Sequence, residues 1–199
     1  AKERHLDASQ LPKYAAAADV LVTRPGGPCG MLGKLYSSFG KEKPVLRAQP
    51  WTRREGEFID TVMSTLRRGG NVLVPVDASG RVLELLLLLS AHWRRQRLDA
   101  AYVLCWVGPM TWNVSNFARS QLEWMAEPLG RQFDSQLGHP YSLKNVNICT
   151  NIAELDIISK STKGLPMTVL ASGGTFDSGP ARDLLLKWGD NPDNAIVFP

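Results

Sequence analysis

Short apolar runs recur along the chain, and glycine, proline or small polar residues close each of them. Within a run the apolar positions are continuous instead of alternating, which is the pattern of strands buried on both faces of a sheet. Such runs predict strands at 18–23, 71–76, 101–107, 146–150, 167–172 and 194–198.

Apolar residues at helical spacing fill several of the segments between these strands. The clearest helix begins at Thr52, which forms a capping box with Glu55, and ends before Gly69-Gly70, where a left-handed residue is wanted. Further helices are predicted at 81–93, 113–127 and 179–188. The alternating order predicts an α/β fold with a mostly parallel sheet flanked by helices.

Two strand-to-helix joints are similar, "VLVPVDASGRVLELLLLL" and "VLASGGTFDSGPARDLLLKW". Each places Ser-Gly between an apolar strand and a leucine-rich helix. Backbone amides and the positive end of a helix converge at such a joint, and Arg81 beside Ser79 in the first joint or Arg182 in the second adds a guanidinium. These residue types are compatible with a site for an anion.

A purely structural interpretation of the first joint is also open. Asp77 or Ser79 would cap the leucine helix, and Gly80 would allow close packing of helix and strand. Arg81 would then pair with Glu84. The sequence favours this structural interpretation without excluding the anion site.

Charge permits a polyanionic partner without requiring one. Lys and Arg number 23 and Asp and Glu 19, which gives a net charge of +4 in a chain with 44% hydrophobic residues. The basic runs 67–68 and 94–97 stand at predicted helix ends, where cations suit the helix dipole, so they predict a solvated face.

The cysteines and the apolar runs bear on the cellular compartment. The 3 cysteines are far apart and form no C-x-x-C pair, so neither a disulfide framework nor a zinc knuckle is indicated, and a reducing, intracellular compartment is predicted. No apolar run approaches the ~18 to 20 residues of a membrane span. The charged start "AKERHLD" lacks the apolar core of a signal peptide.

Common catalytic motifs do not fit this sequence. Gly33-Lys34 and Gly40-Lys41 both lack the first glycine and the hydroxyl of a phosphate-binding Walker loop, and no Gly-x-Ser-x-Gly elbow occurs. The 3 histidines show no metal-ligand spacing. Glu55 either starts a helix or acts in acid chemistry, which would require some influence that raises its pKa against the helix dipole.

Several segments together resemble the β-CASP cassette of metallo-β-lactamase-type RNA-processing nucleases. They are "AKERHLDASQL", "RREGEF", "RRGGNVLVPVDASGRVLELLLLLSAHW", "WNVSNFARSQLEWM" and "VLASGGTFDSGPARDLLLKW". The resemblance spans nearly the whole chain, apart from 24–49. It is nearest to the catalytically silent subunit of the pre-mRNA 3′-end processing factors, because active members tend to have an apolar or aromatic residue where Asp77 stands.

The resemblance implies a division of the chain and a remnant of a catalytic site. Residues 1–50 would be the end of a metallo-β-lactamase-like domain plus a variable Gly/Pro-rich loop, and 51–199 the β-CASP domain. The family's metal ligands lie mostly before this segment and after it, so no cofactor or metal is expected in this chain. Glu55 matches the acidic position that supports catalysis in active members.

The implied function is a non-catalytic β-CASP domain of a nuclear pre-mRNA 3′-end cleavage and polyadenylation factor subunit. It would scaffold the nuclease subunit and other proteins of that complex, without membrane contact. Weak or indirect contact with pre-mRNA would come from Ser79, Arg81 and Arg182. The alternatives are part of an active zinc-dependent β-CASP endoribonuclease whose metal ligands lie outside this chain, and an unrelated α/β enzyme acting on small molecules.

Overall fold

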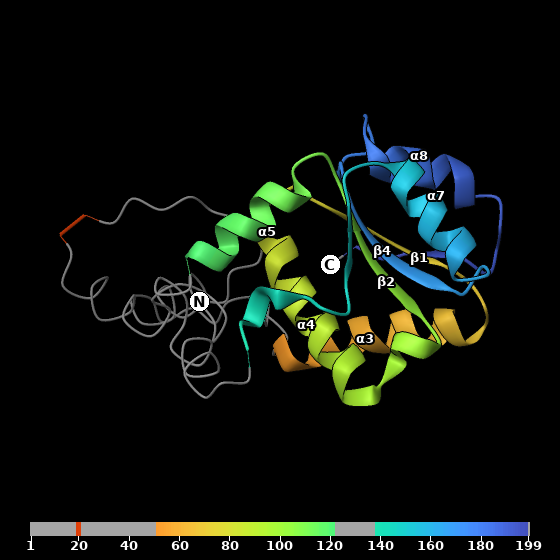
Figure 1. Ribbon diagram of the computed structural model, residues 1–199, viewed down its shortest axis with the longest axis horizontal. Helices are drawn as coiled ribbons and strands as arrows, with labels where there is room; N and C mark the ends of the chain where they lie inside the picture. Colours follow the sequence, from red (N-terminus) through yellow and green to blue (C-terminus); the bar gives the residue numbers. More distant parts are fainter. Residues whose placement is uncertain (1–18, 21–50, 122–137, 199) are drawn as a thin grey trace, which may run out of the picture. The chain divides into compact units, whose positions relative to one another are not determined.

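The computed structural model describes residues 19–20, 51–121 and 138–198. The chain divides into two compact units, and the unit formed by Glu55–Ser120 and Pro140–Pro199 holds the sheet described below. Helices and strands alternate along it (Figure 1). In chain order the elements are α3 (Trp51–Arg67), β1 (Val72–Val76), α4 (Arg81–Gln96), η1 (Leu98–Ala100), β2 (Val103–Val107), α5 (Thr111–Ser120), η3 (Pro140–Ser142), β3 (Asn147–Cys149), α7 (Ile152–Ser161), β4 (Met167–Ser172), α8 (Pro180–Trp188) and β5 (Ala195–Ile196).

The strands form a 5-stranded sheet in the order β3-β2-β4-β1-β5, and every pair is parallel. In the central strands β1, β2 and β4 each residue is buried. The shorter edge strands β3 and β5 are partly exposed. This arrangement confirms the parallel α/β sheet that the continuous apolar runs predict.

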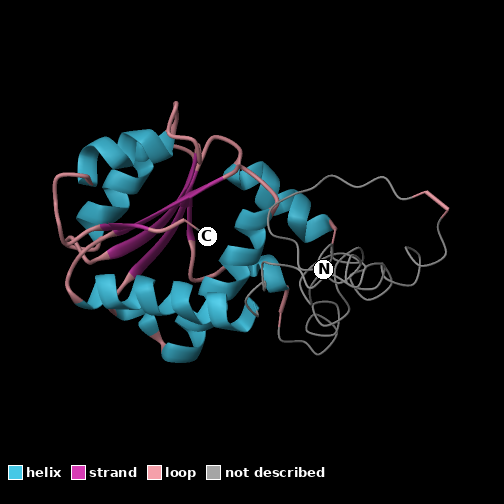
Figure 2. Ribbon diagram, turned by 180° about the vertical axis from the view of Figure 1, so that it is seen from behind, coloured by secondary structure: helices cyan, strands magenta, loops and turns pink. Residues whose placement is uncertain are grey.

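Helices cover both faces of the sheet, with α3 and α4 on one face and α7 and α8 on the other (Figures 1 and 2). The connection from β1 to β2 passes β4 in one direction, whereas that from β3 to β4 passes β2 in the other. Because such crossovers are right-handed, opposite directions place their helices on opposite faces.

Apolar side chains pack on both faces of the sheet. Leu155 of α7 and Leu184 of α8 belong to a cluster with alternate residues of the central strands. The leucine helix α4 buries Leu86, Leu89 and Trp93 completely, and the Trp93 indole nitrogen donates to the Tyr102 carbonyl at 3.2 Å. Each fully buried leucine contributes about 1.5–3 kcal/mol, so these layers hold the strand ends in fixed relative positions.

The helix α7 is absent from the elements that the sequence pattern predicts. Leu155 is its one buried residue, so the apolar periodicity is weak. The signal that could have found it is a cap: the Asn151 side chain accepts from the Glu154 amide at 3.0 Å, and the Glu154 carboxylate accepts from the Thr150 amide at 2.8 Å.

The structure contradicts the predicted start of α3 and confirms its predicted end. The helix begins at Trp51, so Thr52 lies inside it, and the proposed capping box is wrong because Glu55 falls in the second turn. The C-terminal prediction is confirmed: Gly69 has φ 86°, and the Gly70 amide donates to the Thr65 carbonyl at 3.1 Å. Most of the predicted strand 18–23 and residues 122–127 of the predicted helix 113–127 lie outside the described residues.

Candidate anion site at the carboxyl edge of the sheet

The two similar strand-to-helix joints lie next to each other at one edge of the sheet. β1 and β4 are neighbours whose last residues, Val76 and Ser172, are register partners. β1 continues into α4 on one face and β4 into α8 on the other (Figure 1). Ligands of open α/β sheets bind outside the carboxyl ends of strands where neighbouring connections diverge in this way.

The two turns also approach each other at the atomic level. A Cβ atom on Gly174, in the turn after β4, would lie 3.8 Å from Oδ1 of Asp77, in the turn after β1. On the other side of β4, a Cβ on Gly108 would lie 2.7 Å from the Ser172 hydroxyl oxygen. Glycine at position 108 therefore leaves room for the Ser172 hydroxyl, and the ends of three strands form a polar edge.

The turn after β1 corrects two predictions about its structure. Gly80 is the N-cap of α4, and no side chain caps the helix, so neither Asp77 nor Ser79 has the capping role. A Cβ on Gly80 would meet nothing within 4 Å, so this glycine does not serve close packing. Its φ of 75° explains its presence instead, because glycine adopts that conformation without strain.

The turn after β4 is more tightly constrained. Gly173 has φ 101°, and a Cβ there would lie 2.5 Å from the Ser178 carbonyl oxygen. The Phe176 amide donates to the Gly173 carbonyl at 3.0 Å. Gly179 is the N-cap of α8, again without a side-chain cap, and Pro180 occupies the first turn as predicted. Two helices thus begin at this edge with no capping side chain.

The sequence-predicted site residues are brought together only in part. Ser79 lies in the turn after β1, and Arg81 is the first residue of α4. Arg182 lies in the first helical turn of α8. All three residues are exposed. Glu55 is half-buried on α3 and belongs to neither turn. The structure thus joins the two arginine-bearing joints into one candidate site and leaves Glu55 on a separate element.

The electrostatic balance of this edge is mixed. Two uncapped helix N-termini, Arg81 and Arg182 favour an anion. Asp77 lies in the turn after β1 and the exposed Asp177 in the turn after β4, while Glu84 and Asp183 lie in the first turns of α4 and α8. Positive groups interleaved with carboxylates suit a weak contact with a phosphate rather than a tightly held one.

The described cysteines do not supply a reactive thiol. Burial raises the pKa of Cys105 to about 12, and burial raises the pKa of Cys149 to about 11. Both side chains are buried in the core. A thiol that stays protonated at neutral pH is a poor nucleophile and metal ligand. Within the described ranges, no group of three or more His, Cys, Asp or Glu residues could hold a metal ion.

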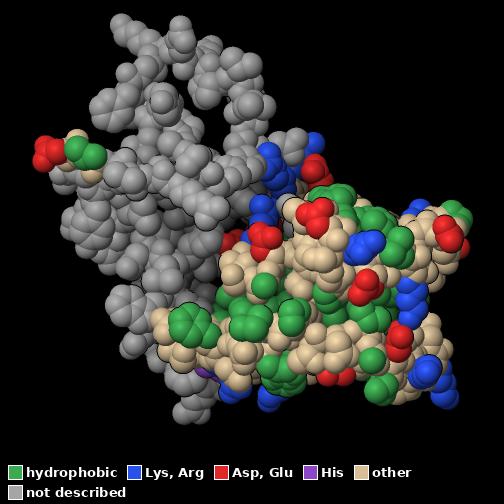
Figure 3. All heavy atoms as spheres, turned by 90° about the horizontal axis from the view of Figure 1, so that it is seen from above, with side chains coloured by type: hydrophobic (Ala, Val, Ile, Leu, Met, Phe, Trp, Pro, Cys, Tyr) green, Lys and Arg blue, Asp and Glu red, His purple; other side chains and the backbone are tan. Residues whose placement is uncertain are grey.

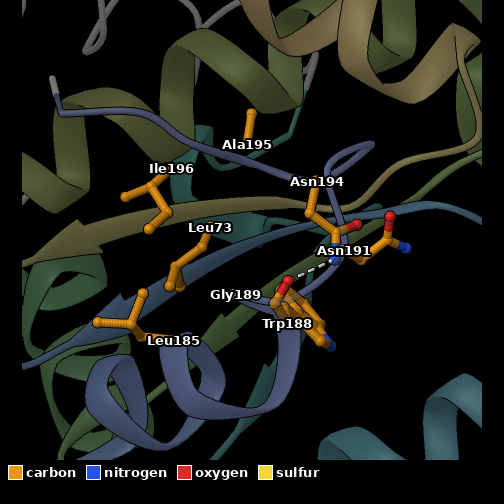
Figure 4. A pocket seen from close by; sticks show the side chains of 8 residues that line it. All are labelled: Leu73, Leu185, Trp188, Gly189, Asn191, Asn194, Ala195 and Ile196. Carbon is orange, nitrogen blue, oxygen red and sulfur yellow. Dashed lines mark hydrogen bonds between the residues drawn. The ribbon is translucent and has the colours of Figure 1, made fainter.

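A separate cleft of about 210 Å³ lies between the end of α8 and β5 (Figure 4). Leu73, Trp188 and Ile196 contribute apolar surface to it. The Asn194 side chain donates to the Trp188 carbonyl at 3.0 Å and accepts from the Asn71 amide at 2.7 Å. These hydrogen bonds hold the α8–β5 turn against the sheet, which gives this asparagine of the cleft a structural role.

Over the described residues, the helices are all too short or too polar to span a membrane.

The family of the chain follows from comparison with known proteins: the Beta-Casp domain model matches residues 82–199. The chain therefore belongs to the Beta-Casp domain family, as the resemblance predicts, and its parallel sheet with flanking helices is consistent with that domain.

Similarity to curated relatives extends over more of the chain than the domain model does. It is 34% identical over 198 residues to cleavage and polyadenylation specificity factor subunit 2 of Arabidopsis thaliana, covering 99% of this chain and 24% of the relative. It is 35% identical over 73% of its length to the probable subunit 2 of Drosophila melanogaster, 19% of that relative. Endoribonuclease ysh1 of Schizosaccharomyces pombe is 26% identical over 99% of the chain, which is 23% of that relative. The chain spans about a quarter or less of these relatives.

Proposed function

We propose that this chain is the non-catalytic β-CASP part of a nuclear subunit of a pre-mRNA 3′-end cleavage and polyadenylation factor. The proposal is supported by identities of 34% and 35% to proteins named subunit 2, against 26% to a protein named endoribonuclease. In this role 51–199 is the β-CASP domain, and 1–50 is the end of a metallo-β-lactamase-like domain with its variable loop.

The chemistry of the carboxyl edge carries the proposal. It offers backbone amides, the Ser79 hydroxyl and the guanidinium groups of Arg81 and Arg182, all of which position a phosphate. The Asp77 carboxylate lies beside the turn after β4, where it repels a phosphate. An edge with both features makes weak contact with RNA, and the subunit then works mainly by binding the nuclease subunit and its neighbours.

The RNA contact is tested with the whole chain and a fluorescein-labelled 20-nucleotide RNA, by fluorescence anisotropy. We expect R81Q/R182Q to weaken binding by roughly fivefold to tenfold and to lower the slope of log K against log salt, because fewer phosphates are neutralised. The control K160Q/K163Q removes two exposed lysines at the end of α7 and should change binding little. An equal loss of RNA affinity in both variants would show that binding depends on net charge and not on Arg81 and Arg182.

The non-catalytic role is tested on the parent subunit. We expect it to copurify with the nuclease subunit of the same organism and to leave a labelled RNA uncut under conditions in which that nuclease cleaves. Zinc-dependent cleavage by the parent alone would contradict the proposal.

The second candidate is part of an active zinc-dependent β-CASP endoribonuclease, favoured by the 26% identity to endoribonuclease ysh1 over nearly the whole chain. Its metal ligands would lie outside this chain. A His-x-His-x-Asp-His motif in the flanking sequence of the parent, together with stoichiometric zinc in the purified subunit, would decide for it.

A further inference from the structure

A second positively charged surface lies at the opposite edge of the sheet. α3 leads through Gly69-Gly70 into the start of β1, and α4 leads through η1 into the start of β2. Because β1 and β2 belong to one parallel sheet, both helices end at its amino edge. The exposed arginines at these two helix ends, called here the amino-edge cluster, are Arg67, Arg68, Arg94, Arg95 and Arg97.

The two helix ends form one electrostatic surface. His92, in the last turns of α4, is affected by a guanidinium from each helix. Burial, with Arg95 and Arg67 of the two helices adding to it, holds the pKa of His92 below its ordinary value, while Asp60 opposes the shift. Arg67 of α3 and Arg95 of α4 thus act on the same imidazole, which agrees with the two helices lying on one face of the sheet and ending at the same edge (Figure 1).

Helix capping does not account for the amino-edge cluster. One cation in the last turn stabilises a helix by about 0.3–1 kcal/mol, and adjacent like charges repel each other. Arg97 follows the last turn with φ 53° and ψ 47°, a left-handed conformation in which glycine is favoured. Against the five guanidinium groups, the nearby part of these elements carries the carboxylates Asp60 and Asp99, and Asp193 approaches Gly70 from the turn after α8. This excess of positive charge indicates a polyanionic partner.

The opposite face of the sheet differs in its charge pattern. There α7 and α8 carry acidic and basic side chains interspersed with hydrophobic ones (Figure 3). Lys187 of α8 pairs with Asp156 of α7 at 2.5 Å. The arginines are therefore concentrated at the ends of α3 and α4, and the chain's modest net charge of +4 does not account for this local excess.

We propose that the amino-edge cluster is a second RNA-binding surface, which contacts the phosphodiester backbone independently of sequence. Protein interfaces depend on large apolar or aromatic anchors. In the unit that holds the sheet, the exposed side chains of that kind lie on α5 and the turn before it, on α7 and α8, and at β5 and just after it. Guanidinium forks without stacking partners match phosphates and carry no base preference. An RNA backbone thus fits this surface better than a protein partner does.

The test measures binding of the full chain to two labelled 20-nucleotide RNAs, oligo-U and a mixed sequence, at several salt concentrations. We expect R94Q/R95Q to weaken binding by about tenfold at low salt, and equally for both RNAs, with the slope of log K against log salt reduced by about 1.4. R94K/R95K, which keeps the charge, should lose less. Circular dichroism and the melting temperature establish that each variant is folded.

The matched control K160Q/K163Q removes the same charge at the end of α7, which leads into the start of β4 and so lies at the same edge but on the other face of the sheet. Unchanged binding of R94Q/R95Q, or the same loss in the control, overturns the proposal. Competition by polyglutamate as effective as that by unlabelled RNA would assign the cluster to an acidic protein segment instead. The inference rests on the proposed role in RNA processing. R94Q/R95Q leaves Arg81 and Arg182 unaltered, so failure of the amino-edge proposal can be distinguished from failure of the carboxyl-edge contact.

Discussion

Asp77 follows β1 directly, and its Oδ1 lies 3.8 Å from the place that a Cβ on Gly174 would occupy. It is exposed, so water screens its charge, and it acts on a neighbouring phosphate through a modest repulsion. Its place between the two turns makes it the residue whose removal reports most directly on whether RNA approaches this edge.

Asp77→Asn should therefore tighten RNA binding at low salt by about two- to fivefold, because it removes a like charge while keeping the size of the side chain. Anisotropy titrations with the 20-nucleotide RNA measure the change. Asp156→Asn, in α7 and away from both ends of the strands, is the control and should give a smaller gain. Equal gains in the two variants would show that RNA does not bind near Asp77.

Two glycines allow a matched test of packing. A Cβ on Gly70 would lie 1.8 Å from the Asp193 carbonyl oxygen, a backbone atom that cannot rotate away. Gly70→Ala should lower the free energy of unfolding by about 1–3 kcal/mol. A Cβ on Gly56, inside α3, would meet nothing within 4 Å, so Gly56→Ala should raise it by about 0.5–1 kcal/mol.

Urea unfolding followed by circular dichroism measures both variants. If Gly70→Ala is as stable as the unaltered chain, the close approach of the β1 entry to the Asp193 turn does not exist in solution.

At the scale of the element, the cap of α7 adds a pH-dependent contribution to the one made by its buried Leu155. Hydrogen bonds from the Thr150 hydroxyl and then from the Thr150 amide hold the pKa of Glu154 below its ordinary value. The folded state therefore favours the ionised carboxylate. Its contribution to stability is present above the pKa of the unfolded chain and is lost as the pH falls through the folded pKa.

Glu154→Gln should accordingly lower the melting temperature at pH 7, and the difference from the unaltered chain should disappear in the acid range below the ordinary carboxyl pKa. Asn151→Ala removes the cap on the Glu154 amide as well as a donor to the Glu154 carboxylate, so its cost of about 1 kcal/mol should decrease at acid pH without disappearing. Thermal melts of the three proteins from neutral pH into the acid range distinguish these patterns. A Glu154→Gln deficit that persists at acid pH would refute the ionic role of the cap.

At the scale of the whole sheet-bearing unit, the two proposed RNA contacts lie at opposite edges of one sheet. The strands that separate them are buried throughout in β1, β2 and β4, and we expect a substitution at one edge to leave the other unchanged. Distant, independent sites have additive free energies.

The combined variant R81Q/R182Q/R94Q/R95Q should thus show a loss of RNA affinity equal to the product of the two double-variant losses, within about a factor of two. The same anisotropy titrations measure it. A combined loss no greater than that of one double variant would mean that the two pairs of arginines serve a single contact.

Local sequence determined most of the elements and little of the site. The runs at 71–76, 101–107 and 167–172 indicate strands, because short continuous apolar segments closed by glycine, proline or polar residues are typical of strands buried on both faces. The leucine helix is likewise evident from its spacing, whereas α7 is not, since it buries Leu155 alone. The cap assigned to Thr52 fails because α3 begins before it.

Which segments meet was decided by the tertiary structure. The chain order does not reveal that β1 and β4 are neighbouring strands. Their pairing brings Asp77 close to Gly174, so that two turns far apart in the sequence lie side by side at one edge of the sheet. Taken singly, the basic runs at 67–68 and 94–97 predict solvated helix ends, and only the parallel strands bring both runs to one edge, where Arg67 and Arg95 act on His92. Hydrophobic periodicity is a local property of the chain, whereas strand order follows from how the helices and sheet bury their apolar faces together.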